Sequence, residues 1–111
     1  MRIIIFTLPS LFFSIALPHT AYAKTPMITI KIKNHLFYPD EVHIPPNKKI
    51  KLFVINEDST PEEFESYELN REKIIMGNGK AVIFIGPLKK GRYLFFGEFY
   101  PKTAQGTVIV K

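Results

Sequence analysis

The pattern of hydrophobic and polar residues divides the chain into an apolar stretch at its start and a series of short segments after it. Residues 27–33 alternate strictly, with Ile28, Ile30 and Ile32 on one face, which is typical of a half-buried strand. Residues 49–56 carry apolar side chains on both faces, so they predict a strand covered on both sides. Residues 81–85 and 107–110 are compact apolar runs of strand length.

Turn residues separate these segments. They occur roughly every ten residues, a spacing typical of all-β domains, at Pro39-Asp40, Pro45-Pro46-Asn47, Gly77-Asn78-Gly79 and Gly86-Pro87. The pattern contains no helix of three turns. We therefore predict an all-β fold, a Greek-key β-sandwich of two antiparallel or mixed sheets.

The least regular part of the chain lies between Glu57 and Arg71. The polar run from Glu57 to Glu63 predicts a loop or a short turn of helix, because the interior of a buried strand does not tolerate such a run. Residues 64–69 are predicted to be extended, with a brief helix between Pro61 and Arg71 as the alternative.

The first 23 residues have the pattern of a secretory signal peptide. Arg2 supplies the positive charge, residues 3–17 are mostly apolar and interrupted by Pro9, and Ala-Tyr-Ala at 21–23 is a cleavage pattern. The apolar stretch is too short and too broken for a stable membrane-spanning helix, although an uncleaved anchor is the alternative. We expect cleavage after Ala23, a single mature domain of residues 24–111 in the periplasm, and no membrane insertion after signal removal.

The composition excludes one kind of metal site. The chain has 111 residues, a net charge of +5 and no cysteine. A blue-copper centre requires a cysteine thiolate together with two imidazoles, so a type 1 copper site is excluded.

The positive charge is a weak indication of a partner. The lysines at 31, 33, 48, 49 and 51 lie among apolar residues in a strand-like pattern, which favours a solvated sheet face or a protected edge strand, with an acidic partner surface as the alternative. Nucleic acid is a poor candidate because an exported chain leaves the cytoplasm.

Several segments resemble a known family. Residues 37–39, 49–58, 91–96 and 106–110 resemble the cupredoxin pattern in order and spacing over essentially all of the mature chain. Residues 59–73 are similar to the cysteine-free cupredoxin-like domains of bacterial periplasmic iron-uptake systems of the EfeO type. The resemblance implies a cupredoxin-like sandwich and, as partners, an iron permease system or other periplasmic iron-uptake proteins.

The same resemblance implies where metal ligands would lie. The first histidine of the cupredoxin pattern falls near Glu62 or Glu63, the cysteine at Gly97, the second histidine at Tyr100 and the methionine near Gln105. All four blue-copper ligands are thus replaced. In the iron-uptake relatives acidic residues are the implied ligands, and they correspond here to Glu65 and Glu98.

The ligand chemistry points to a hard cation. The predicted metal ligands are Glu63, Glu65, Glu68, Glu98 and Tyr100. Carboxylate and phenol oxygens suit ferric iron and, with less preference, cupric ions. Alternation places Glu63 and Glu65 on one face of an extended segment, and Glu68 joins them only if the chain turns. The alternative is that these glutamates are ordinary surface charges that pair with neighbouring lysines and arginines.

Three functions remain open at this point. The first is a periplasmic module that binds ferric or cupric ions in iron uptake. The second is a component of a copper-dependent ferrous iron oxidase, which the absence of a thiolate to tune a redox centre disfavours. The third is a metal-free interaction domain. No Ser-His-Asp arrangement or nucleotide-binding glycine loop is present in the sequence, so an enzyme is the less favoured class.

Overall fold

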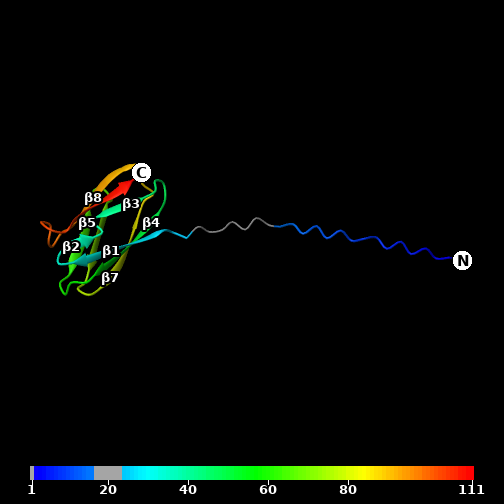
Figure 1. Ribbon diagram of the computed structural model, residues 1–111, viewed down its shortest axis with the longest axis horizontal. Coiled ribbons are helices and arrows are strands. Elements are labelled where there is room, and N and C mark those ends of the chain that lie inside the picture. The colour runs from blue at the N-terminus through cyan, green and yellow to red at the C-terminus, as the bar shows by residue number, and fades with distance from the viewer. Residues whose placement is uncertain (1, 17–23) are drawn as a thin grey trace.

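The computed structural model describes residues 2–16 and 24–111. Residues 24–111 contain two β-sheets packed face to face, whereas residues 2–16 form neither helix nor strand (Figure 1). The described residues contain no helix, and therefore none that could cross a membrane. The predicted cleavage site after Ala23 lies outside the described residues.

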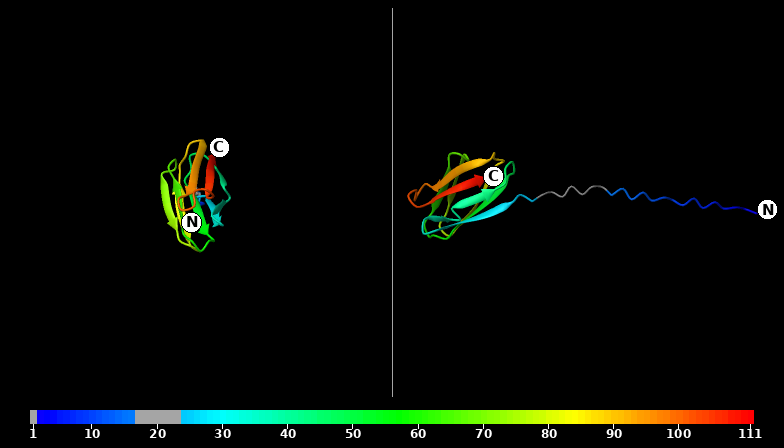
Figure 2. Two further views of the ribbon diagram at one scale, coloured as in Figure 1. Left: turned by 90° about the vertical axis from the view of Figure 1, so that its left-hand side faces the viewer. Right: turned by 45° about the horizontal axis from the view of Figure 1, so that its top comes forward.

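Both sheets are mixed (Figure 2). The four-stranded sheet has the order β2 (Leu36–Tyr38), β1 (Met27–Lys33), β4 (Ile50–Asn56) and β7 (Lys80–Ile85). The five-stranded sheet has the order β3 (Glu41–Ile44), β9 (Gln105–Val110), β8 (Gly91–Gly97), β5 (Glu62–Ser66) and β6 (Arg71–Ile75). Strands β1 and β4 are parallel, as are β3 and β9, and the other pairs are antiparallel. The predicted all-β sandwich is confirmed.

The core lies between the two sheets. The rings of Phe64 and Phe95 stack with centroids 5.0 Å apart, and Phe37 meets Phe95 edge-on at the same distance. Branched aliphatic side chains from both sheets surround these rings, as alternation along each strand requires. Every described core side chain belongs to residues 28–110. We infer that residues 24–111 fold on their own.

A buried asparagine positions the strands that carry the site. Asn56, 1% exposed, lies at the end of β4. Its amide nitrogen donates to the carbonyl oxygens of Thr60 and Ile75 at 2.8 and 3.2 Å, and its oxygen accepts the N–H of Asp58 at 3.0 Å. This network ties β4 to the start of β5 and the end of β6, because a buried amide must satisfy its polar atoms locally.

The region between Glu57 and Arg71 differs from expectation. Strand β5 begins at Glu62, so the prediction of a loop through Glu63 was wrong, and both glutamates are buried in a strand. The extended conformation predicted for residues 64–69 ends at Ser66, and residues 67–70 form a turn. The reason for the first difference is tertiary: strand alternation sends the two carboxyl groups to opposite sides of the sheet, and Oε1 of the inward Glu62 accepts the N–H of Phe99, which is distant in sequence.

Candidate metal centre

Strand β5 carries acidic side chains on both of its faces. Glu62, Phe64 and Ser66 point into the sandwich, where each is at most 1% exposed. Glu63 and Glu65 point to the outward face of the five-stranded sheet, because successive residues of a strand alternate. Since β5 lies between β6 and β8, its outward residues have neighbours on both sides.

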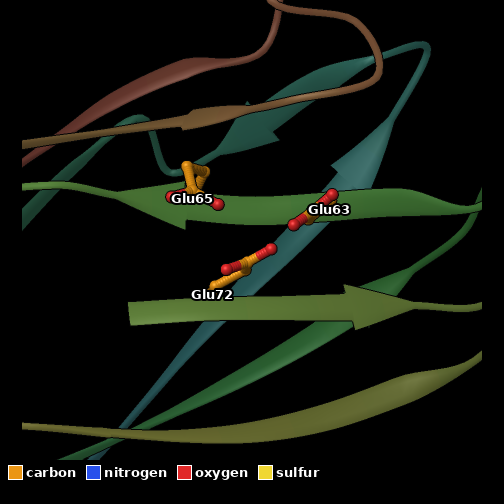
Figure 3. A group of neighbouring side chains, drawn as sticks. All are labelled: Glu63, Glu65 and Glu72. Atoms are coloured by element: carbon orange, nitrogen blue, oxygen red, sulfur yellow. The ribbon is translucent and has the colours of Figure 1, made fainter. Parts of the chain in front are cut away.

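The outward face brings three glutamates together. Glu65 lies directly opposite Glu72 in the antiparallel pair of β5 and β6, and Glu63 lies diagonally from Glu72. One carboxylate oxygen from each of the three lies within 4.8 Å of the others. Figure 3 shows Glu63 and Glu65 on β5 and Glu72 on β6, with the carboxyl group of Glu72 turned toward that of Glu63. We call Glu63, Glu65 and Glu72 the glutamate cluster.

Glu98 borders the glutamate cluster on the other side of β5. Its N–H donates to the carbonyl oxygen of Glu63 at 2.9 Å, which extends the pairing of β5 and β8 by one residue beyond Gly97. Its side chain is exposed, and its charge acts on both Glu63 and Glu65. The fold therefore brings Glu65 and Glu98 to one region of the surface although they are distant in sequence.

Mutual repulsion changes the ionisation of the cluster. A hydrogen bond with the side chain of Glu72, loss of solvent and repulsion by the neighbouring carboxylates raise the pKa of Glu63 to about 7. Burial and the charges of Glu72 and Glu98 also raise the pKa of Glu65, against a hydrogen bond with Glu63 that lowers it. Glu63 is 8% exposed, Glu65 is half-buried and Glu72 is exposed, so water reaches the cluster from its outer edge. A cation bound among the three carboxylates would relieve this repulsion.

The inward face of β5 holds a different carboxyl group. Oε1 of Glu62 accepts the N–H groups of Glu63 and Phe99, both at 2.9 Å, while Oε2 has no hydrogen-bond partner among the described residues. A Cβ atom at Gly97 would lie 2.5 Å from the carboxyl carbon of Glu62 and 2.7 Å from Cβ of Ala104. Gly97 is therefore the residue that makes room for Glu62.

These residues do not fit a type 1 copper ion. The chain has no cysteine, and the Glu62 carboxyl occupies the space that a side chain at residue 97 would need. Tyr100 stacks on His35, with ring centroids 3.5 Å apart and an angle of 14° between the planes. The backbone N–H of His35 donates to Oδ2 of Asp58 at 3.0 Å, and Nδ1 of its imidazole lies 3.5 Å from the same oxygen, so this imidazole belongs to a structural contact.

Three of the five predicted metal ligands lie in or beside the glutamate cluster. Glu63 and Glu65 belong to the cluster and Glu98 borders it, whereas Tyr100 packs on His35. Glu68 lies in the turn after β5, and its Oε2 accepts the N–H of Leu94 at 2.8 Å. Neither Glu68 nor Tyr100 is part of the glutamate cluster.

Sequence reasoning did not include Glu72. Its position depends on the register of the β5–β6 hairpin, in which Ser66 pairs with Arg71 and Glu65 with Glu72. The asparagine at residue 70 was the sequence signal for this turn, because asparagine often takes the left-handed conformation in turns, and Asn70 has φ of 52° in the structure. A turn recognised there would have placed Glu72 beside Glu65.

The contact between Glu62 and Gly97 gives the first prediction. Gly97→Ala is expected to lower the free energy of unfolding by about 1 to 3 kcal/mol, because the new methyl group overpacks against the Glu62 carboxyl. In a Glu62→Ala background the same change should cost clearly less, since the methyl group then fills vacated space. Urea denaturation of the four proteins in the cycle measures this coupling. The matched control is a second cycle that pairs Gly97→Ala with Glu65→Ala, on the opposite face of β5, and there the two losses of stability should add. If the losses also add in the cycle with Glu62→Ala, the packing described here is contradicted.

The raised pKa of Glu63 gives the second prediction. From about pH 4.5 to about pH 7 the folded chain keeps a proton on Glu63 that the unfolded chain has lost. Raising the pH through this window therefore lowers the free energy of unfolding of the metal-free domain. Urea denaturation at a series of pH values should show this decline, and Glu63→Gln should flatten it while Glu68→Gln leaves it intact. A stability that rises across the window, or a slope unchanged by Glu63→Gln, would refute the assignment.

Several solved structures have the same fold as this chain. The metal binding domain of the Cu(I)-exporting P-type ATPase CopA of Streptococcus pneumoniae, solved with Cu(I), matches with a TM-score of 0.65 and 17% identity over 77% of this chain and 84% of that chain. Amicyanin from Paracoccus versutus matches with a TM-score of 0.61 and 15% identity, over 82% and 87% of the two chains. A purple cupredoxin from Nitrosopumilus maritimus gives 0.57 and 19%, over 78% and 99%. At these identities the likeness shows the shared fold alone.

The sequence comparisons extend this likeness to a family. An uncharacterised protein of Rickettsia prowazekii is 48% identical over 83 residues, which cover 75% of this chain and 66% of the relative's length. The sequence model of the cupredoxin-like domain matches residues 3–110. The match spans nearly the whole chain, including all the strands that build the sandwich. The chain therefore belongs to the family of cupredoxin-like domains.

Proposed function

We propose that residues 24–111 form a periplasmic metal-binding module that holds a ferric or cupric ion on Glu63, Glu65 and Glu72, with Glu98 beside them. The observation that carries the proposal is the convergence of three carboxylates from two strands, with ligand oxygens within 4.8 Å of one another. Three ligands leave positions on the ion for water or for a ligand supplied by a partner.

The electrostatics of the glutamate cluster support a cation rather than an empty surface. A hydrogen bond with Glu72, together with desolvation and like charges, raises the pKa of Glu63, and desolvation and like charges raise the pKa of Glu65, so the surroundings of both carboxyl groups disfavour their charged forms. A bound cation supplies the missing positive charge and displaces the proton that Glu63 holds. Carboxylate oxygens select hard cations over the soft cuprous ion.

The fold family supports a metal ion as the ligand. The carboxylate oxygens of the glutamate cluster support a harder ion than Cu(I). The structures of the CopA domain and of two amicyanin variants contain Cu(I). In the present chain the proposed ligands are oxygens on the outside of the five-stranded sheet, away from the position where Glu62 lies against Gly97. We propose that this displacement accompanies a change from a soft ion to a hard one.

The proposed role in iron uptake is supported by the sequence alone. The signal-peptide pattern of residues 1–23 supports export, and the similarity of residues 59–73 to EfeO-type domains supports an iron permease system as the partner. The module then passes its ion to the permease without changing its oxidation state.

Calorimetric titration of residues 24–111 with ferric citrate and with a cupric salt tests the ligand set. We expect one ion to bind, and Glu63→Gln, Glu65→Gln and Glu72→Gln each to weaken binding by at least about tenfold, the loss that even outer-shell changes cause at metal sites. Glu68→Gln removes the same charge outside the cluster and is the matched control, which should bind like the unaltered protein. No heat above that of dilution, or equal losses in the control, would refute the site and leave the metal-free interaction domain as the better account.

The same titration in buffers of different ionisation heats adds an independent readout. Because ligands must be deprotonated, binding at a pH below the raised pKa of Glu63 should release a proton, and Glu63→Gln should abolish that release. Binding without proton release would place the ion elsewhere.

A further inference from the structure

The outward face of the four-stranded sheet has an apolar centre. In the register of β1, β4 and β7, Phe53 lies between Thr29 and Val82, and Phe84 lies beside Lys51 in the next row. Val82 and Phe84 are each 41% exposed, and Phe53 is half-buried. This outward face of the sheet carries no second layer of the described chain, since the core lies on its other side.

Lysines border this apolar centre at both ends. Nζ of Lys49 and of Lys51 lie 4.5 and 5.8 Å from the centroid of the Phe84 ring. At the other end, Ile55 lies between Lys31 and Lys80, and Lys31 contacts Glu57 just beyond β4 at 3.4 Å. We call Lys31, Lys51 and Lys80 around Phe53, Val82 and Phe84 the lysine face.

The charge on the two outer faces of the sandwich is opposite in sign. Among the described strands of the four-stranded sheet, no outward side chain is acidic. The outward face of the five-stranded sheet carries the glutamate cluster and Glu41 against one arginine, Arg92. The field of the molecule therefore presents its positive side through the lysine face.

We propose that the lysine face binds the surface of an anionic phospholipid bilayer. Its lysines contact lipid phosphates, while Phe53, Val82 and Phe84 lie at the level of the headgroups. An apolar centre within a cationic border is the arrangement that interfacial binding requires, because buried apolar area and attraction to anionic lipid add to each other. We choose an anionic bilayer as the partner because its negative phosphates complement the positive lysines.

The kind of cation favours lipid over an acidic protein. All the basic side chains of the lysine face are lysines. Arg92 belongs to a strand of the other sheet, and Arg71, on β6, reaches the edge of β7 but uses its guanidinium on the carbonyl oxygens of Phe84 and Asn70, at 2.7 and 2.8 Å. A fixed carboxylate on a protein surface is recognised best by the planar, bidentate guanidinium group of arginine. Lysine acts as a point charge on a flexible stem, and this suits phosphate groups that move within a fluid surface.

Binding of the lysine face to a bilayer fixes the direction in which the glutamate cluster points. With the lysine face on the bilayer, the five-stranded sheet lies on the far side of the sandwich and the glutamate cluster points away from the membrane. Lipid binding does not depend on the proposed metal function, because the two surfaces belong to different sheets.

Sedimentation of residues 24–111 with phosphatidylglycerol vesicles and with phosphatidylcholine vesicles tests the proposal. We expect binding to the phosphatidylglycerol vesicles alone, with affinity that falls as salt is added. Each lysine replaced on the lysine face should lower the partition coefficient roughly fivefold, which corresponds to about 1 kcal/mol per basic residue at an anionic surface. Lys51→Gln combined with Lys80→Gln should therefore lower it roughly twenty-five-fold.

The matched control is Lys102→Gln combined with Lys111→Gln, which removes the same charge from exposed residues outside the four-stranded sheet. The control should retain most of the binding. Equal losses in the two double variants would show attraction to net charge alone and overturn the proposal. It is also overturned if the protein ignores both kinds of vesicle, or if it binds polyglutamate and not phosphatidylglycerol, since the latter result identifies an acidic protein surface as the partner.

Discussion

Two consecutive glutamates on β5 face opposite sides of one sheet, and the geometry of the candidate site depends on this alternation. The inward carboxyl of Glu62 accepts N–H groups from both Glu63 and Phe99, which fixes the segment after β8 against β5. The N–H of Glu98, between Gly97 and Phe99, donates to the carbonyl oxygen of Glu63. The buried carboxyl thus holds the backbone in the arrangement that places Glu98 beside Glu63 on the outside. Gly97 is part of the same arrangement, because a side chain there would collide with Glu62.

The consequence for function is a separation of charge across a thin molecule. Carboxylates accumulate on the outward face of the five-stranded sheet, and lysines border the outward face of the other sheet. A hydrogen bond with Glu72, loss of solvent and repulsion within the glutamate cluster raise the pKa of Glu63 to about 7, so Glu63 holds a proton that the proposed cation would displace. The cupredoxin-like fold thereby carries an oxygen-rich glutamate cluster on its surface, where we propose that a cation binds.

Patterning predicted the parts of this fold that depend on local sequence. The alternation of Ile28, Ile30 and Ile32 and the apolar runs of β4, β7 and β9 identified the strands, because one buried face imposes a period of two. The start of β5 was missed, because a run of charged residues normally marks a loop and only tertiary hydrogen bonds make Glu62 acceptable in the core. Glu72 was missed because hairpin register determines its position. The proximity of Glu65 and Glu98 came from family resemblance, since strand pairing between β5 and β8 leaves no local signal.

The most direct test of the account is a crystal of residues 24–111 soaked in a ferric or a cupric salt, with anomalous scattering recorded at the absorption edge of the metal. The account predicts one anomalous peak within coordination distance of carboxylate oxygens of Glu63, Glu65 and Glu72, on the outward face of β5 and β6. A peak at another place, beside the stacked rings of His35 and Tyr100 for example, or an unoccupied glutamate cluster at saturating metal, would contradict it.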